Sequence, residues 1–243
     1  MKNIILILFC IIIHQGCKKD SLCNCIENTG SDKTEIRQLE AFNAIELNNN
    51  VDVILTPDSS YFAEVTSGKN LMDGIETKVI GDRLVIRNKN RCNWLRDFEN
   101  KFIVNIHYKS IRQITNNGSG NLSCADTLRE NYLMVENWNG TGELNFKING
   151  KETYLKIHTG PADIIASGKS ELLYIYSAGN GYVRSANLVA NYINVTNKST
   201  GDCEIFPLYE MDVKIGYSGD VYYKGNPTVI KQDITGTGIL APL

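Results

Sequence analysis

The chain of 243 residues has little histidine, and its cysteines do not gather around the few histidines present. Three histidines and seven cysteines occur, and His107 and His158 are far apart in the sequence. Metal sites need such side chains in clusters at short spacings, so no zinc site and no other cofactor is expected. Beyond Cys10 and Cys17 five cysteines remain, an odd number that does not form a closed disulfide framework.

The sequence also lacks an excess of charge of either sign. It contains 25 lysines and arginines and 27 aspartates and glutamates, which gives a net charge of −2. A nucleic-acid-binding protein would carry a concentrated basic surface. We therefore expect no nucleic-acid partner.

No hydrophobic run is long enough for a transmembrane helix. The longest, residues 4–13, has ten apolar residues, whereas a bilayer needs roughly 20. The run follows the basic start "MKN", and a short apolar core after a basic start is typical of an export signal.

The segment after this run resembles the cleavage region of a bacterial lipoprotein. Gly16 precedes Cys17, which implies a signal peptide over residues 1–16 and a lipid on the cysteine. The two residues before the glycine depart from that pattern, so an ordinary signal peptide cleaved nearby is the alternative. The polar, aperiodic residues 17–38 are typical of a flexible tether. Lys18, rather than aspartate, implies by resemblance to the Gram-negative sorting rule an outer-membrane lipoprotein, at the cell surface or on the periplasmic side.

Apolar residues recur in pairs of the form apolar–x–apolar in the second half of the chain. Glycine turns separate the pairs, and after most turns a second short β-favouring run follows, such as "LNFKI", "CEIF" or "VYY". Each unit of about 20 residues thus holds two strands of period 2. The pairs are Leu133/Val135, Leu155/Ile157, Leu173/Ile175, Ile193/Val195 and Val213/Ile215.

Self-similarity at this period predicts a solenoid. A leucine-rich repeat would need a leucine-dense consensus, and the strands of a sandwich need not repeat in register. We expect an all-β protein with a single-stranded parallel β-helix (β-solenoid) over residues 39–243. In that geometry Cys124 and Cys203 lie about four rungs apart, roughly 19 Å, which is too far for a disulfide. One buried column is expected to contain Leu133, Leu155, Leu173, Ile193 and Val213.

Glycine followed by a short acceptor side chain marks each expected corner, as in "GSGN" and "SGD". Glycine supplies the positive φ that such corners often need. The acceptors are expected to bind local backbone N–H groups. Stacked carboxylates could instead hold calcium, but calcium-binding coils have denser signatures, so solvated corner acids are expected. The acceptors are Asn121, Asp163, Asp202 and Asp220.

Several spaced motifs resemble those of the head GIN domain family, whose members are known as auto-transporter adhesins of Gram-negative bacteria. The likeness extends from residue 40 to residue 243 and implies a β-helical fold, frequent lipoprotein anchoring and a place at the cell surface or in the periplasm. It supplies no established activity and no catalytic residues. The motifs are F-x-x-I-x-L at 42–47, "VDVILT" at 51–56, "NLMDGIETKV" at 70–79, "LVIRN" at 84–88 and the recurring glycine corners.

Two segments depart from the repeat. Residues 88–101 form a charged loop in which Trp94 and Phe98 are expected to cap the coil locally, with a binding loop as the alternative. The last corner ends either in a cap around Pro242 or in an open edge through which copies could associate.

Tyrosines alternate with the buried positions and therefore point outward. Aromatic rings at rung spacing can stack on sugar faces while their hydroxyls bond sugar oxygens, with Lys156 and Asn194 as polar contacts. The alternative is that tyrosine simply suits an outward strand position. One outward column is expected to contain Tyr132, Tyr154, Leu172 and Tyr192, with Tyr174 and Tyr176 beside it.

Catalysis is not expected. From residue 130 onward the only arginine is Arg184, whereas β-helical lyases generally add basic groups beside their acids. Paired carboxylates, a nucleophile elbow and a Ser/Cys–His arrangement are absent from the sequence pattern. We expect an envelope-anchored, non-catalytic, adhesin-like lipoprotein that recognises a glycan or a protein through its outer β faces. The alternatives are a structural, self-associating envelope protein and, last, a carbohydrate-active enzyme.

Overall fold

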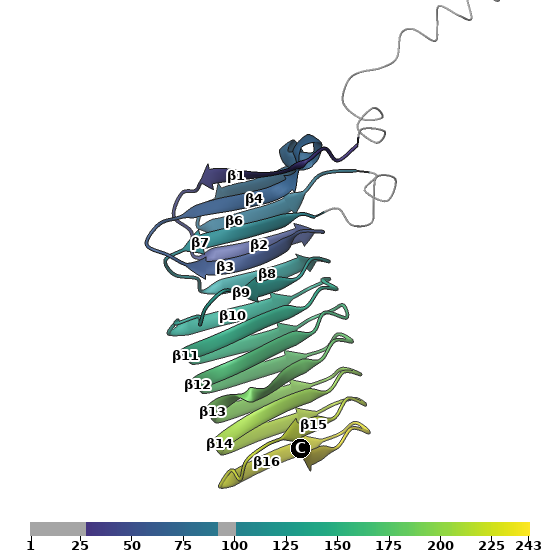
Figure 1. The fold of residues 1–243 in the computed structure, drawn as a ribbon. Helices are drawn as coiled ribbons and strands as arrows, with labels where there is room; N and C mark the ends of the chain where they lie inside the picture. The colour runs from purple at the N-terminus through teal and green to yellow at the C-terminus, as the bar shows by residue number, and fades with distance from the viewer. Residues whose placement is uncertain (1–27, 92–100) are drawn as a thin grey trace, which may run out of the picture.

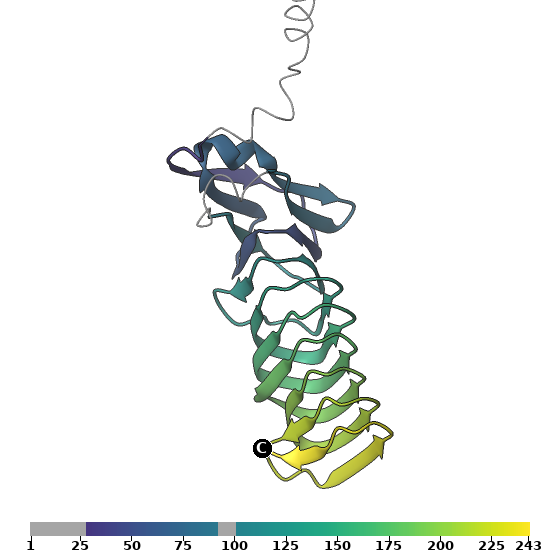
Figure 2. The same ribbon diagram turned by 90° about the vertical axis from the view of Figure 1, so that its right-hand side faces the viewer.

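The computed structural model describes residues 28–91 and 101–243, which form a tower of stacked strands (Figures 1 and 2). The expected signal peptide, Cys17, Trp94 and Phe98 lie outside the described residues. The helix of this part of the chain is the short 3-10 helix η2 (Lys69–Gly74). Among the described residues, no helix has the length and the apolar character that crossing a bilayer would require.

The second half of the chain forms the parallel β-solenoid that the repeat predicts. Partners in neighbouring rungs are 20 residues apart at Leu155↔Ile175 and again at Ile175↔Val195. Each long strand from β11 to β14 contains both short strands expected for one rung. The strands are β10 (Tyr132–Asn137), β11 (Leu144–Ile157), β12 (Ile164–Ser177), β13 (Val183–Asn197), β14 (Cys203–Ile215), β15 (Val221–Tyr223), β16 (Val229–Ile234) and β17 (Leu240–Pro242).

The N-terminal part is less regular because it mixes parallel and antiparallel pairs. β2 is parallel to β6 and β8, and β3 is parallel to β7 and β9, whereas β4 is antiparallel to β7. β5 and β6 form a hairpin whose two-residue turn begins at Gly81, with φ of 66°. The strands are β2 (Ala44–Asn49), β3 (Asp52–Pro57), β4 (Phe62–Gly68), β5 (Ile75–Ile80), β6 (Arg83–Asn88), β7 (Ile103–Tyr108), β8 (Gln113–Gly118) and β9 (Leu122–Cys124).

The sheet begins earlier than the sequence pattern indicates. Residues 32–38, assigned above to the end of the tether, form strand β1 (Asp32–Gln38), which pairs antiparallel with β4. This strand lies at the opposite end of the tower from β16 (Figure 1). Because four of its side chains are charged, this strand has no recognisable β pattern in the sequence. Charged side chains are common on edge strands, where they discourage pairing with other chains. The four charged residues are Asp32, Lys33, Glu35 and Arg37.

In two rungs the residue that lies in the expected buried column is two positions before the one predicted from the sequence. Leu173 lies beside Ile193 as expected, but Leu155 lies between Val135 and Ile175. A shift of two residues keeps a side chain on the same face of its strand, so all these side chains remain buried and the solenoid is unchanged. The register places Leu133, Thr153, Leu173, Ile193 and Met211 in one column, and Val135, Leu155, Ile175, Val195 and Val213 in the next.

Buried asparagines make hydrogen bonds between rungs at the corners of the tower, whereas the buried hydroxyl of Ser67 in β4 has no hydrogen-bond partner among the described residues. Asn137 is fully buried, and its Oδ1 accepts a hydrogen bond of 2.9 Å from Asn116 of the preceding rung. Its Nδ2 donates to the carbonyl oxygen of Thr159 in the following rung, at 2.8 Å. Buried amides of this kind stabilise the stack because each one connects three rungs without leaving an unpaired group.

The corner acceptors bind the next rung rather than local backbone, which corrects the expectation from sequence. Asp220 Oδ1 accepts a hydrogen bond of 2.9 Å from the N–H of Ile239, and Asp163 Oδ1 accepts one of 2.9 Å from the N–H of Tyr182. Stacking brings this N–H close because equivalent corner residues lie one above the other. Asn121 and Asp202 make the same contact, with Glu143 and Asp220 respectively.

Glycine at the corners is required by close packing more often than by positive φ. Gly160 has a φ of 83°, but Gly142 and Gly201 do not have positive φ. A Cβ atom on Gly142 would collide with the carbonyl oxygen of Gly120 in the neighbouring rung, and one on Gly201 would collide with that of Gly181. Successive corners therefore approach one another too closely to admit a side chain.

Candidate ligand-binding face

One side of the tower carries the tyrosines that the sequence singles out. It is formed by β10, by the second halves of β11 to β14 and by β16, which run side by side (Figure 1). Alternate side chains of these strands enter the core, and the others point outward. We call the outward side chains of residues 132–138, 152–158, 172–176, 192–196, 210–214 and 229–233 the tyrosine face.

Three rings form an aromatic stack on this face. The rings of Tyr154 and Tyr174 are nearly parallel, with centroids 4.7 Å apart and planes at 5°. The ring of Tyr132 reaches diagonally to Tyr154, at 5.2 Å. The single outward column expected from sequence is therefore wrong in one member. Tyr132, Glu152, Leu172 and Tyr192 form one column, and Met134, Tyr154, Tyr174 and Asn194 form the next.

Polar groups border this stack. Lys156 Nζ lies 5.6 Å from the centre of the Tyr154 ring, a distance typical of a cation–π contact. The hydroxyl of Tyr154 donates a hydrogen bond of 3.3 Å to Glu152 Oε2. Burial, and then the negative charge of Glu152, raise the pKa of Tyr154 above its ordinary value. The hydroxyl therefore stays protonated at neutral pH and can donate a hydrogen bond.

A second pair of rings lies at the edge of the face, where the sequence reading did not look. The rings of Trp138 and His158 are stacked, with centroids 3.9 Å apart and planes at 8°. His158 Nε2 is 3.1 Å from Oε1 of the buried Glu136, which fixes the imidazole and so supports the indole. Tyr176 contacts the imidazole at 5.6 Å. The 20-residue spacing of Trp138 and His158, one rung, is the signal that could have found this pair.

Further down the face lies a shallow hollow of about 270 Å³. Tyr192 and Asn194, two of the predicted ligand-binding residues, both line it. Glu210 and Lys231 lie on its other side and form an ion pair of 2.5 Å. Leu172, Ile193 and Asp212 complete the lining. The predicted residues therefore fall into two groups on one face: the stack with its neighbours, and this hollow.

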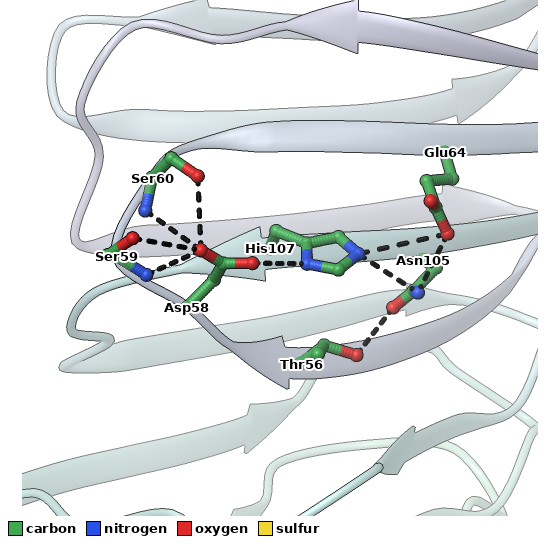
Figure 3. A network of polar contacts seen from close by, with 7 residues as sticks. All are labelled: Thr56, Asp58, Ser59, Ser60, Glu64, Asn105 and His107. Carbon is green, nitrogen blue, oxygen red and sulfur yellow. Dashed lines mark hydrogen bonds and ion pairs between the residues drawn. The ribbon is translucent and has the colours of Figure 1, made fainter.

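A separate polar network lies in the N-terminal part, and Figure 3 shows it around His107. His107 Nδ1 is 2.9 Å from Asp58 Oδ2, and His107 Nε2 is 3.1 Å from Asn105 Nδ2. Because the amide nitrogen of Asn105 can only donate, Nε2 accepts and Nδ1 donates to the carboxylate. The His107 ring is also stacked on Phe62, with centroids 3.9 Å apart.

This network is structural rather than catalytic in its geometry. The hydroxyl of Ser60 donates to Asp58 Oδ1 at 3.1 Å instead of facing His107, so serine and histidine do not form a nucleophile–base pair (Figure 3). The hydrogen bond from His107 is the main cause that lowers the pKa of Asp58 from 3.8 to about 2. The network joins the loop after β3 to β7. In the described ranges, no group of three or more His, Cys, Asp or Glu side chains is placed to hold a metal ion.

Comparison with protein families gives one match. Residues 41–227 match the family model described as "Putative auto-transporter adhesin, head GIN domain". No curated protein matches the chain.

Solved structures of bacterial proteins share the fold. A putative adhesin from Bacteroides fragilis NCTC 9343 matches with a TM-score of 0.81 at 19% identity, over 88% of this chain and 97% of that one. A putative adhesin from Parabacteroides merdae ATCC 43184 matches with a TM-score of 0.68 at 18% identity, over 90% and 98%. A putative lipid binding protein from Parabacteroides distasonis ATCC 8503 matches with a TM-score of 0.69 at 20% identity, over 90% and 99%. At identities this low the likeness shows the fold alone.

Proposed function

This chain belongs to the head GIN domain family, and from that membership we propose that it is a non-catalytic, adhesin-like protein that holds a glycan on its tyrosine face. The observation that carries the proposal is the juxtaposition of the Tyr132–Tyr154–Tyr174 stack with the hollow at Tyr192 on one continuous outer surface. The description of the family and of its neighbours as adhesins supports a binding role.

The side chains of the face match the chemistry of a sugar. A pyranose ring has an apolar face that packs on an aromatic ring, and hydroxyl groups at its edge that need donors and acceptors. Tyr192 and Trp138 are 45% and 44% exposed and offer such rings. Asp212 and Asn194 in the hollow supply an acceptor and an amide for sugar hydroxyls. A chain of sugars could therefore run along the stacked strands.

Three features of the hollow bear on its function: the first two argue against turnover, and the third argues against a lipid ligand. Glu210 and Asp212 are alternate residues of one strand, whereas glycosidases place their two carboxyl groups on opposite sides of the scissile bond. Glu210 is moreover held by Lys231. Lipid binding, the description of one neighbour, would need an apolar cavity, and this hollow is lined mainly by polar side chains.

We also propose that the protein is anchored in the outer membrane through a lipid on Cys17. The short apolar run at residues 4–13 and the Gly16–Cys17 pair support this anchoring. Display at the cell surface would place the tyrosine face where an adhesin needs it. Digestion of the protein by protease added to intact cells is the expected result, and protection would place it on the periplasmic side.

The binding proposal is tested with the full-length chain in detergent on a glycan array, followed by titration of the best ligand. Tyr192→Ala and Tyr132→Ala should each weaken binding by up to about tenfold, since one aromatic contact contributes roughly 0.5–1.5 kcal/mol. Tyr182→Ala is the matched control, because Tyr182 is as exposed as Tyr132, 38% each, but precedes the first residue of β13 and lies outside the tyrosine face.

Three outcomes would overturn the proposal: no glycan bound above background, equal losses in Tyr182→Ala and Tyr192→Ala, or cleavage of the bound glycan. The first outcome, combined with binding of a protein that Tyr192→Ala abolishes, would instead make the face a protein-binding surface.

A further inference from the structure

The last rung leaves the end of the tower open along strand β16. In the described chain β16 pairs only with β14, and all six of its residues are exposed. Ile230 and Ile234 occupy core positions, yet they are 46% and 41% exposed, whereas Met211 and Ile215 at the same positions one rung earlier are 0% and 1% exposed. An exposed apolar edge of this kind is a template for pairing with another strand.

The backbone groups that face this edge can be assigned from the hydrogen bonds on the other side. The N–H of Thr235 donates to the carbonyl oxygen of Ile215 in β14, at 2.9 Å. Because backbone groups alternate along a strand, the odd-numbered residues of β16 face β14. Ile230, Gln232 and Ile234 therefore point their N–H and C=O groups at the open edge.

The sequence "IKQDI" at residues 230–234 is complementary to itself when it is read in the opposite direction. With Gln232 opposite Gln232 of a second copy, Ile230 faces Ile234 and Lys231 faces Asp233. We infer that the end of the tower binds a second copy of this chain, through antiparallel pairing of β16 about a two-fold axis at Gln232. In this arrangement the inward side chains of both copies lie on the same face, so the two cores join.

Each position of this register finds a partner. Lys231 already forms an ion pair with Glu210 of its own chain, so in the dimer its ammonium group lies between two carboxylates. The even-numbered residues exchange backbone hydrogen bonds with the partner, as their orientation requires. Lys231 and Asp233 form the intervening non-hydrogen-bonded pairs, in which side chains are closest, and each dimer contains two such pairs. Asp233 makes no ion pair within the described residues of one chain. The two Gln232 amides can donate to and accept from each other across the axis.

Neighbouring registers are disfavoured by charge. A shift by two residues in one direction places Lys231 opposite Lys231, and a shift in the other direction places Asp233 opposite Asp233. Like charges directly opposite each other destabilise an antiparallel pair. A shift by one residue would turn apolar side chains to the solvent face. The charge pattern therefore selects one register.

The opposite end of the tower has no such pattern. Strand β1 is also an edge strand, but four of its seven residues are charged, and this density opposes pairing. A dimer formed through β16 would place the two β1 strands at its far ends. The inference rests on the tower end and does not depend on a glycan bound to the tyrosine face. Strand β16 also lies beyond the residues matched by the family model.

The test uses two variants that are complementary to each other. Lys231→Glu leaves only acidic side chains at positions 231 and 233, and Asp233→Lys leaves only basic ones. Each variant alone should associate at least tenfold more weakly than the wild type, because both charge pairs become repulsive. An equimolar mixture should recover association, because the two basic side chains of one variant then face the two acidic side chains of the other.

The measurement is the detergent-corrected molar mass of the full-length chain by light scattering, over a range of concentrations. The mass of one chain is 27.2 kDa. The wild type and the mixture should approach twice this mass, whereas each variant alone should stay near the mass of one chain. Circular dichroism melting of each variant checks that it is folded. Wild type that stays at the mass of one chain at all concentrations, or a mixture that does not recover, would overturn the inference. The first of these results would indicate that the edge of β16 pairs with a strand of a different protein.

Discussion

The carboxylate of Asp202 accepts a hydrogen bond of 2.8 Å from the backbone N–H of Asp220, the equivalent residue one rung further along the chain. Asp220 in turn binds the N–H of Ile239, so the same bond is repeated from rung to rung. The N–H groups at this corner have no strand partner in the ladder. The acids of the "GD" corners thus supply acceptors that the backbone does not.

Removal of this acceptor should destabilise the tower. Asp202→Ala leaves the N–H of Asp220 without its partner and should cost about 1–3 kcal/mol in the free energy of unfolding, the range for a donor that is left without its acceptor in the folded state. Asp202→Asn keeps an acceptor oxygen at the same place and should cost much less. Urea denaturation followed by circular dichroism measures both. Equal losses in the two variants would show that charge, and not the acceptor, matters.

A methyl group at a corner glycine should be more damaging than one elsewhere. Gly142→Ala would force the corner away from the carbonyl oxygen of Gly120 and should cost about 1–3 kcal/mol, as overpacking does. Gly216→Ala is the control, because a Cβ atom there meets only the flexible Lys198 side chain, with Cγ at 3.3 Å, and the carbonyl oxygen of Asn197 at an ordinary contact distance of 3.9 Å, and φ is not positive. Thermal melting of both variants should separate them, and similar melting temperatures would contradict the packing argument.

The Asp58–His107 contact should make stability depend on pH in the acid range. Folding lowers the pKa of Asp58 from 3.8 to about 2, so its contribution is fully present above pH 3.8 and is lost as the pH falls toward 2. Asp58→Asn should be less stable than the wild type at pH 6, and the difference should shrink as the pH falls through 3.8 and vanish below about pH 2. In His107→Leu the pKa of Asp58, followed by NMR, should return toward 3.8. A constant difference between wild type and Asp58→Asn across this range would refute the linkage.

The proposed lipid anchor has a direct chemical test. Cells that express the full chain and are fed a clickable palmitate analogue should label the protein, and Cys17→Ala should lose the label. Cys23→Ala is the matched control and should keep it. Labelling that persists in Cys17→Ala, or wild type without label, would be evidence for an ordinary cleaved signal peptide.

The repeat in the sequence was sufficient to predict the solenoid and the length of a rung, but not its register. The strand of each rung on the tyrosine face has three inward positions, and a polar residue occupies a different one in different rungs: Asn137 at the third, Thr153 at the first. Alignment of the first apolar residue of each pair therefore shifts the Thr153 rung by two residues. In the Val213 rung all three inward residues are apolar, so two pairs were possible and the chosen one omitted Met211. The period constrains spacing, whereas the register depends on which inward position tolerates a polar group.

The sequence predicted which residues lie on the candidate face, but only part of how their side chains contact one another. The outward direction of Tyr154 and Tyr174 follows from alternation alone. The diagonal contact from Tyr132 depends on ring orientation, which no sequence pattern encodes. His107 and Asp58 are separated by 49 residues in a part of the chain with no regular period, so nothing in the sequence brings them together.

The bond between Asp202 and Asp220 has one consequence for the dimensions of the molecule. At the consecutive corners of Asp202, Asp220 and Ile239, each carboxylate binds the N–H of the next corner. A rung duplicated between Asp202 and Asp220 that keeps aspartate at this corner would therefore find matching groups on both sides. Every such step would change the distance between the two ends by about 4.8 Å. The fold is in this sense an extensible spacer, whose length can change in whole increments while both ends keep their structure.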